Sequence, residues 1–352
     1  GDIRRGETSL APTMGWAIAL AMLLVPLGAQ AQNVSKVGTT SGQFLKIGVG
    51  ARSVALGASG VADAQGAEAL YWNPAGLSRL GTQGEAMAMH TDHLAGLTHD
   101  FVGAALPALG GHVGIAATVF SVPDDEVRTY DQQQGTGETF DATSLALALS
   151  YGRAVTDRFS VGATGKFVQE RIWNSSARGV AFDLGVQFRT DFWGGLTLGA
   201  ALYNFGSDMK MDGRDIAAQI DPDPRIEGNN GQIPAQYRLD SWSLPTDFQI
   251  GVTMQPISSR LQTLTLSVDA LHPASNYESV NVGAEYAVRD RVFLRGGYEG
   301  LGLGEEFERG LSAGVGVALP LPYGGGLAKI DYAYQGKGRL GGLHVVGAAV
   351  TF

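Results

Sequence analysis

The 352-residue chain contains no cysteine, and charged residues make up only 17% of it. Without cysteine there can be no disulfide framework, no thiolate metal site and no lipid-modified N-terminal cysteine. Soluble domains carry about 25% charged residues, so the low fraction suits a chain with much of its surface facing something other than water. The formal net charge is −9, which argues against a nucleic-acid partner because no basic cluster reverses it.

The sequence also lacks an apolar run of the ~20 residues that a membrane-spanning helix needs. The run Trp16–Leu27 is too short, but it follows Arg4 and Arg5 and precedes a small-x-small cleavage pattern. We therefore interpret residues 1–31 as a signal peptide and expect the mature chain to begin at Gln32. An uncleaved anchor is the alternative. An exported chain of this kind can be periplasmic, secreted or an outer-membrane barrel.

Glycine, by contrast, is abundant at 51 residues. From Gly84 onward, the chain consists of short segments of alternating polarity that are separated by turn residues. In RGVAFDLGVQFRT, apolar side chains recur at every second residue from Val180 to Phe188, whereas Asp183 and Gln187 fall on the other face. LQTLTLSVDAL and SVNVGAEYAV repeat this arrangement. One face suits lipid and the other a polar lumen, which predicts an all-β fold, a transmembrane antiparallel β-barrel over residues 84–352.

Roughly fourteen such segments can be counted, an even number as single-chain bacterial barrels require. They are expected to start near Glu85, Leu97, His112, Ala142, Phe159, Arg178, Leu196, Leu244, Leu261, Ser279, Val292, Leu311, Leu327 and Leu343. Short turns such as PALGG and VRDR fall at one end, expected to be periplasmic. The longer segments 122–140, 206–242 and 299–309 fall at the other. A soluble sandwich has no reason to sort its loops in this way.

The last segment, HVVGAAVTF, alternates as well and ends on the aromatic Phe352, as outer-membrane barrels do. Together with the signal peptide, it predicts that the mature chain lies in the cell outer membrane, in contact with its lipid.

Residues 32–83 precede the first predicted strand and lack its alternation. A barrel of this size leaves a lumen that its side chains alone do not fill, so we expect this segment to lie inside the barrel as a plug. Its stretch GAEALYW should form one short helix that Asn73 and Pro74 end. The Asn73 amide should satisfy free backbone groups, and Gly76 should adopt a positive φ. A disordered periplasmic arm is the alternative. The candidate plug motif is Trp72, Asn73, Pro74, Ala75 and Gly76.

Charged residues fall on the inward faces of the predicted strands. They are Lys166, Glu170, Asp183, Arg189, Asp269, Glu285, Arg295, Lys329 and Asp331. Opposite charges across a lumen would pair with one another or with backbone groups of the plug. These residues are therefore expected either to lock the plug or to line a pathway for solutes.

Other chemistries fit the sequence poorly. GVGARS lacks the third small residue of a dinucleotide loop. His90 and His93 are three residues apart, which places them on opposite faces of a strand, so no metal site is expected. The acidic segment 221–227 is expected to be a solvated outer loop, with loose calcium binding as the alternative. No serine, histidine and aspartate arrangement has a nucleophile-elbow context, so neither catalysis nor a cofactor is expected, although a site built from distant residues stays open.

The stretch FLKIGVGARSVALGASGVADAQGAEALYWNPAGL resembles the N-terminal signature of the PorV/PorQ group of outer-membrane proteins. That group is similar to FadL-type long-chain fatty-acid channels, whose plug also carries an Asn-Pro-Ala element. LYNFGSDMKMDG and LPTDFQIGV resemble the group's segments around a middle strand. The resemblance implies a FadL-like barrel of about fourteen strands with an N-terminal plug. It also implies a role in a type IX secretion system, whose members accept cargo from the translocon and present it to a cell-surface sortase.

Two functions follow from this interpretation. The first is a non-enzymatic secretion component that binds cargo and partner proteins through its outer loops and periplasmic rim. The second is a FadL-like channel for uptake of hydrophobic small molecules. The lining near Trp72, Phe167 and Phe293 should separate them, because a continuous apolar cavity favours uptake and a filled one favours docking.

Overall fold

The structure is a computed structural model that describes residues 38–192, 195–222, 225, 232–303, 310–322 and 326–352. The predicted signal peptide at 1–31 and the first residues of the predicted mature chain lie outside this part. Among the described residues, no helix combines the length and the apolar character needed to cross a membrane.

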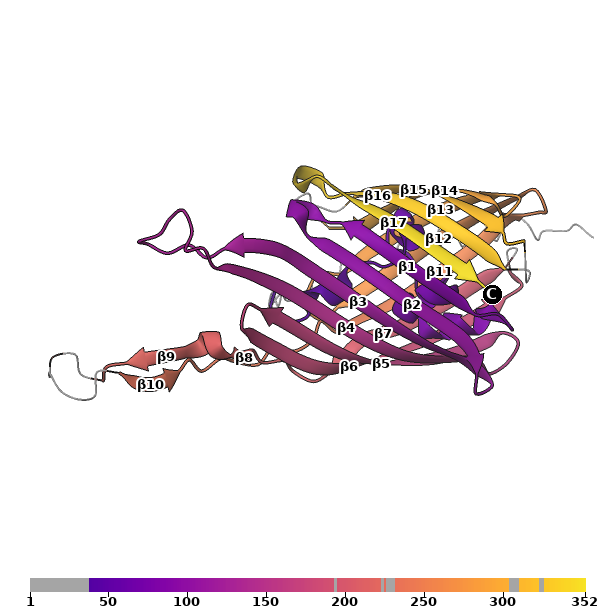
Figure 1. Cartoon of the computed structure of the whole chain (residues 1–352). Coiled ribbons are helices and arrows are strands. Elements are labelled where there is room, and N and C mark those ends of the chain that lie inside the picture. The colour runs from indigo at the N-terminus through magenta and orange to yellow at the C-terminus, as the bar shows by residue number, and fades with distance from the viewer. Residues whose placement is uncertain (1–37, 193–194, 223–224, 226–231, 304–309, 323–325) are drawn as a thin grey trace, which may run out of the picture. The chain divides into compact units, whose positions relative to one another are not determined.

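Fourteen antiparallel strands close into a single barrel (Figure 1). They are β1 (Glu85–Asp92), β2 (Thr98–Ala108), β3 (Gly111–Glu126), β4 (Thr139–Ala154), β5 (Phe159–Ile172), β6 (Ser175–Thr190), β7 (Leu196–Gly206), β11 (Asp247–Ser258), β12 (Gln262–Pro273), β13 (Ser279–Val288), β14 (Val292–Leu301), β15 (Leu311–Pro320), β16 (Leu327–Gly336) and β17 (Gly342–Thr351). Each pairs with the next along the chain, and β1 pairs with β17 to close the sheet. The predicted all-β barrel is thus confirmed.

The two faces of the strands differ as the alternation predicted. In β6, the five outward side chains from Val180 to Phe188 are 38–57% exposed, whereas the inward Ala181 and Asp183 are 0% and 1% exposed. The same pattern holds in β12, where Val268 points outward and is 45% exposed while Asp269 is fully buried. A closed barrel with an apolar outer band satisfies every strand's backbone groups within the sheet, which is what a hydrocarbon environment requires.

The connections differ in length between the two ends of the barrel. Connections of two to six residues join β2–β3, β4–β5, β6–β7, β11–β12, β13–β14 and β15–β16 at the end that also holds the C-terminus, here termed the short-turn end. The opposite, long-loop end holds the 207–246 connection. Strands β3 and β4 reach further at this end than predicted, because they continue pairing past a bulge to Glu126 and Thr139 and so include the outer residues of the expected 122–140 loop. The predicted loop 299–309 lies partly outside the described residues.

The 207–246 connection contains its own short elements. These are β8 (Asp212–Gly213), the 3₁₀ turn η6 (Arg214–Ile216), β9 (Ala217–Ile220) and β10 (Ile233–Gln236). Strand β8 pairs with the first residues of β6, and β9 pairs with β10 as a separate two-stranded hairpin (Figure 1).

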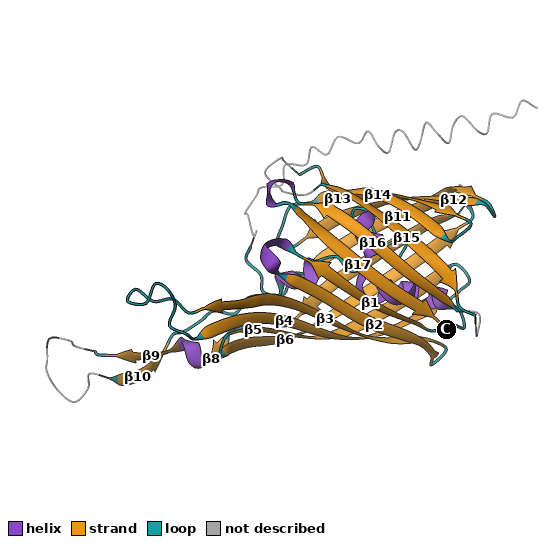
Figure 2. Cartoon of the chain, turned by 45° about the horizontal axis from the view of Figure 1, so that its top comes forward, coloured by secondary structure: helices purple, strands orange, loops and turns teal. Residues whose placement is uncertain are grey.

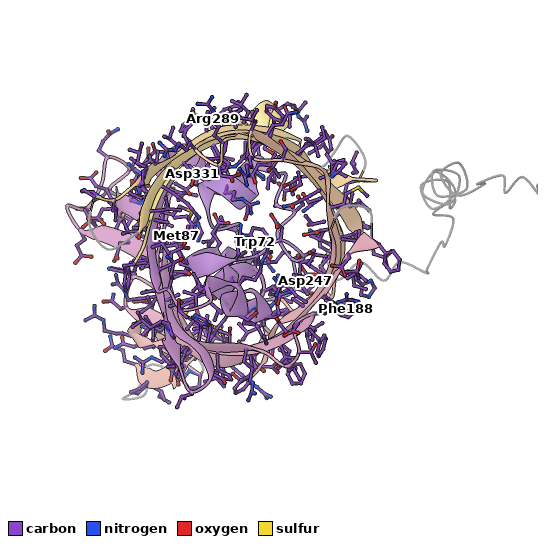
Figure 3. All side chains as sticks on the ribbon, turned by 90° about the vertical axis from the view of Figure 1, so that its right-hand side faces the viewer. Trp72, Met87, Phe188, Asp247, Arg289 and Asp331 are labelled. Atoms are coloured by element: carbon purple, nitrogen blue, oxygen red, sulfur yellow. The ribbon has the colours of Figure 1, made fainter. Side chains whose placement is uncertain are left out.

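The segment before β1 lies inside the barrel (Figures 2 and 3). It forms the short elements η1 (Gln43–Lys46), α2 (Ala51–Ala55), η2 (Gly66–Glu68), α3 (Ala69–Trp72) and η3 (Pro74–Leu80). Its apolar residues make one core with the inward faces of β1, β2 and β17, for example Trp72 with Met87 and Val345 in the same cluster. Further 3₁₀ turns, η4 (Leu94–Gly96) and η7 (Gly338–Leu340), lie in loops at the long-loop end. The N-terminal segment therefore occupies the lumen.

We expect Val268→Arg to lower the free energy of unfolding by about 2–4 kcal/mol, because Val268 points outward near the middle of β12. Leu261→Arg is the matched control. Leu261 is also apolar and 62% exposed, but it lies in the turn before β12, where an arginine should cost about 0–1 kcal/mol. Denaturant titrations of the folded protein in lipid vesicles measure both values. Equal losses would contradict the membrane-facing orientation of β12.

Candidate functional site

The interface between the N-terminal segment and the inner wall is the candidate functional site, because it determines how the lumen is filled. We use "plug" for residues 38–83 and "wall" for the fourteen barrel strands. Figure 3 looks along the barrel from the short-turn end and shows Trp72 within the ring of strands, with Asp247 and Asp331 on the wall.

Asn73 joins two parts of the plug to the wall. Its side chain is fully buried, and its amide nitrogen donates to the carbonyl oxygens of Val61 at 2.8 Å and Val186 at 3.1 Å. Its Oδ1 atom accepts from the backbone N–H of Ala75 at 3.1 Å. Val61 belongs to the plug and Val186 to β6, so one amide satisfies backbone groups on both sides of the interface.

Pro74 begins a helical turn as well as ending one. Helix α3 stops at Trp72, and Asn73 is extended with φ −166° and ψ 106°. The next turn, η3, starts with Pro74 at its first position, where a missing N–H costs nothing because that group has no intrahelical partner. The chain thus makes a further 3₁₀ helix before it enters β1.

Gly76 does not adopt the positive φ that the sequence suggested. It lies inside η3, and a Cβ at this position would clash with the carbonyl oxygen of Ala64. The glycine is required by close packing of two plug backbones and not by a left-handed conformation. Ala75, the neighbouring motif residue, is fully buried as well.

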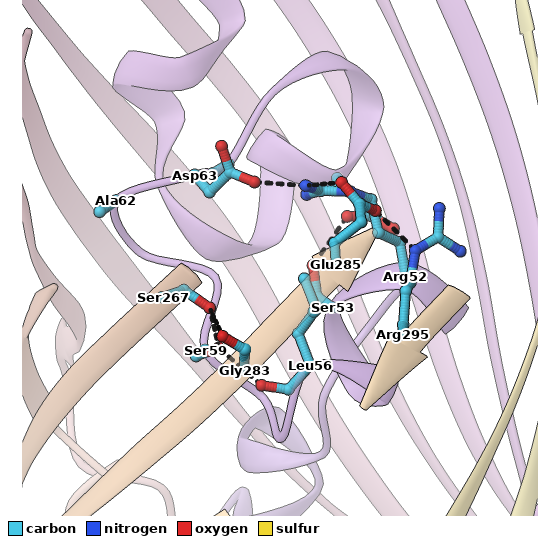
Figure 4. A network of polar contacts seen from close by, with 12 residues as sticks. Arg52, Ser53, Leu56, Ser59, Ala62, Asp63, Ser267, Gly283, Glu285 and Arg295 are labelled. Carbon is cyan, nitrogen blue, oxygen red and sulfur yellow. Dashed lines mark hydrogen bonds and ion pairs between the residues drawn. The ribbon is translucent and has the colours of Figure 1, made fainter. Parts of the chain in front are cut away.

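The largest group of charges lies between the plug and strands β13–β16 (Figure 4). Arg52 of helix α2 pairs with the plug's Asp63 and, at 3.0 Å, with Glu285 on β13. Glu285 also accepts from Arg295 on β14 at 2.6 Å, and Arg295 contacts Asp331 on β16 at 2.5 Å. The side chain of Arg295 is only 3% exposed. Pairing of this kind is what keeps ionised groups tolerable in a buried setting.

A second charged cluster lies across the lumen on β5, β6 and β7. Lys166 pairs with Asp183 at 2.6 Å and donates to Asn204 Oδ1 at 2.9 Å. The remaining predicted lumen residues meet plug backbone or other charges. Glu170 accepts from the N–H of Gly42 at 3.1 Å, Asp269 accepts from the N–H of Val61 at 2.9 Å, and Lys329 lies 3.9 Å from Glu85. Arg189 lines a cavity at the short-turn end with Asp63 and Arg79. The charged residues predicted to face the lumen therefore do so in several separate groups and do not form one site.

The sequence reasoning missed the plug's own half of these contacts. Arg52, Asp63 and Arg79, which lies 3.4 Å from Asp63, belong to a segment without alternation, so no periodicity points to them. Gln187 was placed on the inward face, but its contacts with the plug carbonyls of Ala62 and Ala64 were not foreseen. The available signal was the presence of only four charges between residues 47 and 80, in a segment otherwise made of small and apolar residues.

Glycines on the wall explain how the plug fits so closely. A Cβ at Gly185 would clash with the side chain of Asn73, and a Cβ at Gly199 would lie 2.5 Å from the Cα atom of Ala62. Gly297 on β14 similarly meets the backbone of the plug at Leu56. Glycine at inward positions therefore lets two backbones approach, which accounts for part of the chain's high glycine content.

Two of the cavities between plug and wall bear on a route through the barrel, and these two share no lining residue. One, of about 230 Å³, lies at the long-loop end and includes Trp72; the other, of about 250 Å³, lies at the short-turn end and includes Phe293. The expectation that Phe167 lines the lumen with them is wrong. Phe167 is 38% exposed on the outer face, because its neighbours Lys166 and Val168 point inward. The three aromatics do not form one continuous lining.

The histidines and acidic residues suggest no metal centre within the described part of the chain. No group of three or more histidine or acidic side chains there is arranged to hold a metal ion. His90 is exposed and lies 2.6 Å from Asp100, whereas His93 contacts Phe120 and lines the long-loop cavity. Most of the acidic segment 221–227, where loose calcium binding was the alternative, lies outside the described residues.

Comparison with known proteins agrees with this architecture. The family model described as type IX secretion system protein PorV matches residues 29–269. The toluene transporter TbuX of Ralstonia pickettii has a TM-score of 0.52 and 14% identity, with 86% of this chain and 97% of TbuX covered. The toluene transporter TodX of Pseudomonas putida gives the same TM-score, identity and coverages. At these identities the two structures show a shared barrel fold alone. No curated protein matches the chain.

We expect joint replacement of Asn73, Pro74 and Gly76 with alanine to loosen the plug without reducing strand content. The change leaves two carbonyls without the Asn73 amide, at about 1–3 kcal/mol for an unsatisfied buried group, and forces a Cβ against Ala64. The variant should conduct ions in a planar bilayer where the parent does not. Gln83→Ala, an exposed position just before β1, is the control and should stay closed. A closed triple variant, or a freely conducting parent, would show that the plug does not seal the lumen.

Arg52→Met should destabilise the protein by about 1–3 kcal/mol, because Asp63 and Glu285 lose their shared partner and keep only Arg79 and Arg295. It should also expose the plug to trypsin. Arg128→Met breaks an exposed ion pair with Asp125 and should cost no more than about 1 kcal/mol. Urea midpoints and cleavage rates of both variants give the comparison. If Arg52→Met behaves like Arg128→Met, the buried network does not hold the plug.

Proposed function

Because the chain belongs to the family of type IX secretion system protein PorV, we propose that it binds cargo and partner proteins as a non-catalytic component of such a system. The family and the closed fourteen-stranded barrel indicate the outer membrane as its location. The long-loop end then faces outward and the short-turn end faces the periplasm.

The observation that carries the proposal is the hairpin β9–β10. Among the described residues, these two strands pair only with each other, so both outer edges keep free N–H and C=O groups. An isolated two-stranded hairpin is marginally stable in water, and open edges readily pair with a strand of another protein. Ile220 and Ile233 face each other across the hairpin and are 49% and 40% exposed. This surface suits a protein partner.

The base of the hairpin is held to the wall. Ser175 on β6 pairs with Gly213 on β8, and Asp215 accepts from the N–H of Asn174 at 2.9 Å. On the barrel side of these contacts, Met209 and Trp242 join the two arms of the connection through two backbone hydrogen bonds of 2.8 Å. An anchored base fixes where the hairpin leaves the barrel, which supports a docking role over that of a loose surface loop.

Uptake of hydrophobic molecules is the second candidate. It is supported by the long-loop cavity, whose lining includes the apolar side chains Leu45, Ile47 and Trp72. A continuous route through the barrel would favour this function more strongly. The two cavities instead touch different parts of the plug and share no residue, which favours docking.

We expect Ile220→Lys combined with Ile233→Lys to reduce recovery of partner proteins by about tenfold or more, because it places two charges on the apolar face of the hairpin. Gln219→Lys is the control, since Gln219 pairs with Pro234 on the opposite face. The measurement is mass spectrometry of proteins retained with each variant after gentle detergent extraction from its own cells.

Sortase-like or translocon partners retained by the parent and the control, but lost with the double variant, support the proposal. If all three retain the same proteins, the hairpin is not the docking element. If none retains a partner and the purified protein carries toluene into lipid vesicles, uptake is the better description.

A further inference from the structure

Two inward side chains near the long-loop end carry acceptor atoms that the fold leaves without a donor. Asp247 begins β11, Gln249 follows on the same face, and the two residues are 8% and 7% exposed. Gln249 Nε2 donates to Asp247 Oδ2 at 2.7 Å. Asp247 Oδ1 and Gln249 Oε1 have no hydrogen-bond partner among the described residues. Buried polar atoms are nearly always paired, so two adjacent exceptions point to a donor from outside the fold.

Both residues line the 230 Å³ cavity, together with the rings of Tyr71, Trp72 and Tyr203. The polar tips of these rings are already engaged. Tyr71 O–H donates to the carbonyl of Leu45 at 3.0 Å, Trp72 Nε1 donates to that of Val49 at 2.7 Å, and Tyr203 O–H donates to that of Trp72. The aromatic residues therefore contribute their rings to the cavity but supply no donor to Asp247 or Gln249.

We propose that this cavity binds a primary ammonium group carried on a short apolar stem. An ammonium has three donors and no acceptor, which matches a carboxylate and an amide oxygen that both lack donors. A carboxylate also strengthens the hydrogen bond through its charge, and aromatic rings attract cations. An anionic ligand would meet the charge of Asp247, and an alcohol would satisfy only one of the two acceptors.

The lysines that line the cavity have other partners. Lys166 pairs with Asp183 at 2.6 Å, and Lys337 pairs with Glu299 at 2.7 Å. Lys46 donates to Gln43 Oε1 at 3.2 Å and lines the same cavity as Asp247. Removal of the Lys46 ammonium should lower the positive charge at the cavity and so tighten the binding of another ammonium.

The ammonium could come from a free amine or from a lysine side chain of a bound protein, and the recognising chemistry is the same. The inference does not rest on the proposed secretion role, because the site lies inside the barrel and its probe is a small molecule. Failure of the hairpin experiment would leave it unaffected.

The test is isothermal titration calorimetry of the full-length protein in a non-ionic detergent at pH 7.5, with hexylamine and hexanoate as matched probes. Hexylamine should bind saturably and hexanoate should not. Asp247→Asn should weaken hexylamine binding by about tenfold, since it removes the charge but keeps the shape. Gln249→Leu should also weaken it. Glu278→Gln, which alters an exposed carboxylate in the neighbouring β12–β13 loop, is the control and should bind like the parent.

Lys46→Met should bind hexylamine more tightly than the parent. A lysine-containing peptide that binds better than hexylamine, and loses binding when its lysine is Nε-acetylated, assigns the site to a protein side chain. The reverse order assigns it to free amines. Equal binding of hexylamine and hexanoate, unchanged affinity in Asp247→Asn variants that migrate as folded barrels on unheated gels, or no hexylamine binding in both parent and Lys46→Met would overturn the proposal.

Discussion

A barrel of fourteen strands encloses more space than its own inward side chains fill, and the rest of this structure depends on how that space is occupied. Here a chain segment enters the lumen, so its backbone polar groups need partners away from bulk water. Close approach requires small residues on both surfaces, which is why a Cβ at Gly185 or Gly199 on the wall would collide with the plug. The small residues of the plug and the glycines of the wall both serve to let the two backbones approach closely.

The same requirement explains where the charges lie. Plug backbone groups that have no strand partner form hydrogen bonds with side chains instead. Asn73 donates to the carbonyls of Val61 and, on the wall, Val186, and Asp269 accepts from the N–H of Val61. Ionised groups are then placed in pairs, because an unpaired charge in this setting is costly. Asp247 and Gln249 depart from this rule, since each keeps one acceptor atom without a partner among the described residues. Other inward atoms, such as Asp269 Oδ1, also lack a hydrogen-bond partner within the described part of the chain, but Asp247 and Gln249 lie side by side on one cavity.

The two ends of the barrel differ in how their strands are connected. At the short-turn end the strands are joined by connections of only two to six residues, which leave little chain to contact a partner. At the long-loop end, β3 and β4 stay paired with each other beyond a bulge, as far as Glu126 and Thr139. The hairpin β9–β10 has two unpaired edges among the described residues, and its base is held to β6 by β8. Tight packing in the lumen and open strand edges outside favour a protein that binds other proteins at one surface.

The sequence by itself determined the fourteen barrel strands and their faces, because alternation at every second residue is a local property of each strand. For residues 32–83, which lack alternation, it left a plug and a disordered arm as alternatives. Val180 to Phe188 and Val268 could be assigned to the outer face without knowledge of any neighbour. Only the tertiary structure decided which inward groups meet: Arg52 and Glu285 are 233 residues apart, and Gly76 owes its place to the carbonyl of Ala64 and not to its own φ. Phe167 is a different case, because alternation along the strand already places it on the outer face once Lys166 is assigned to the lumen. Contacts across a lumen are set by closure of the whole barrel around the plug, and no periodicity along a single strand encodes that closure.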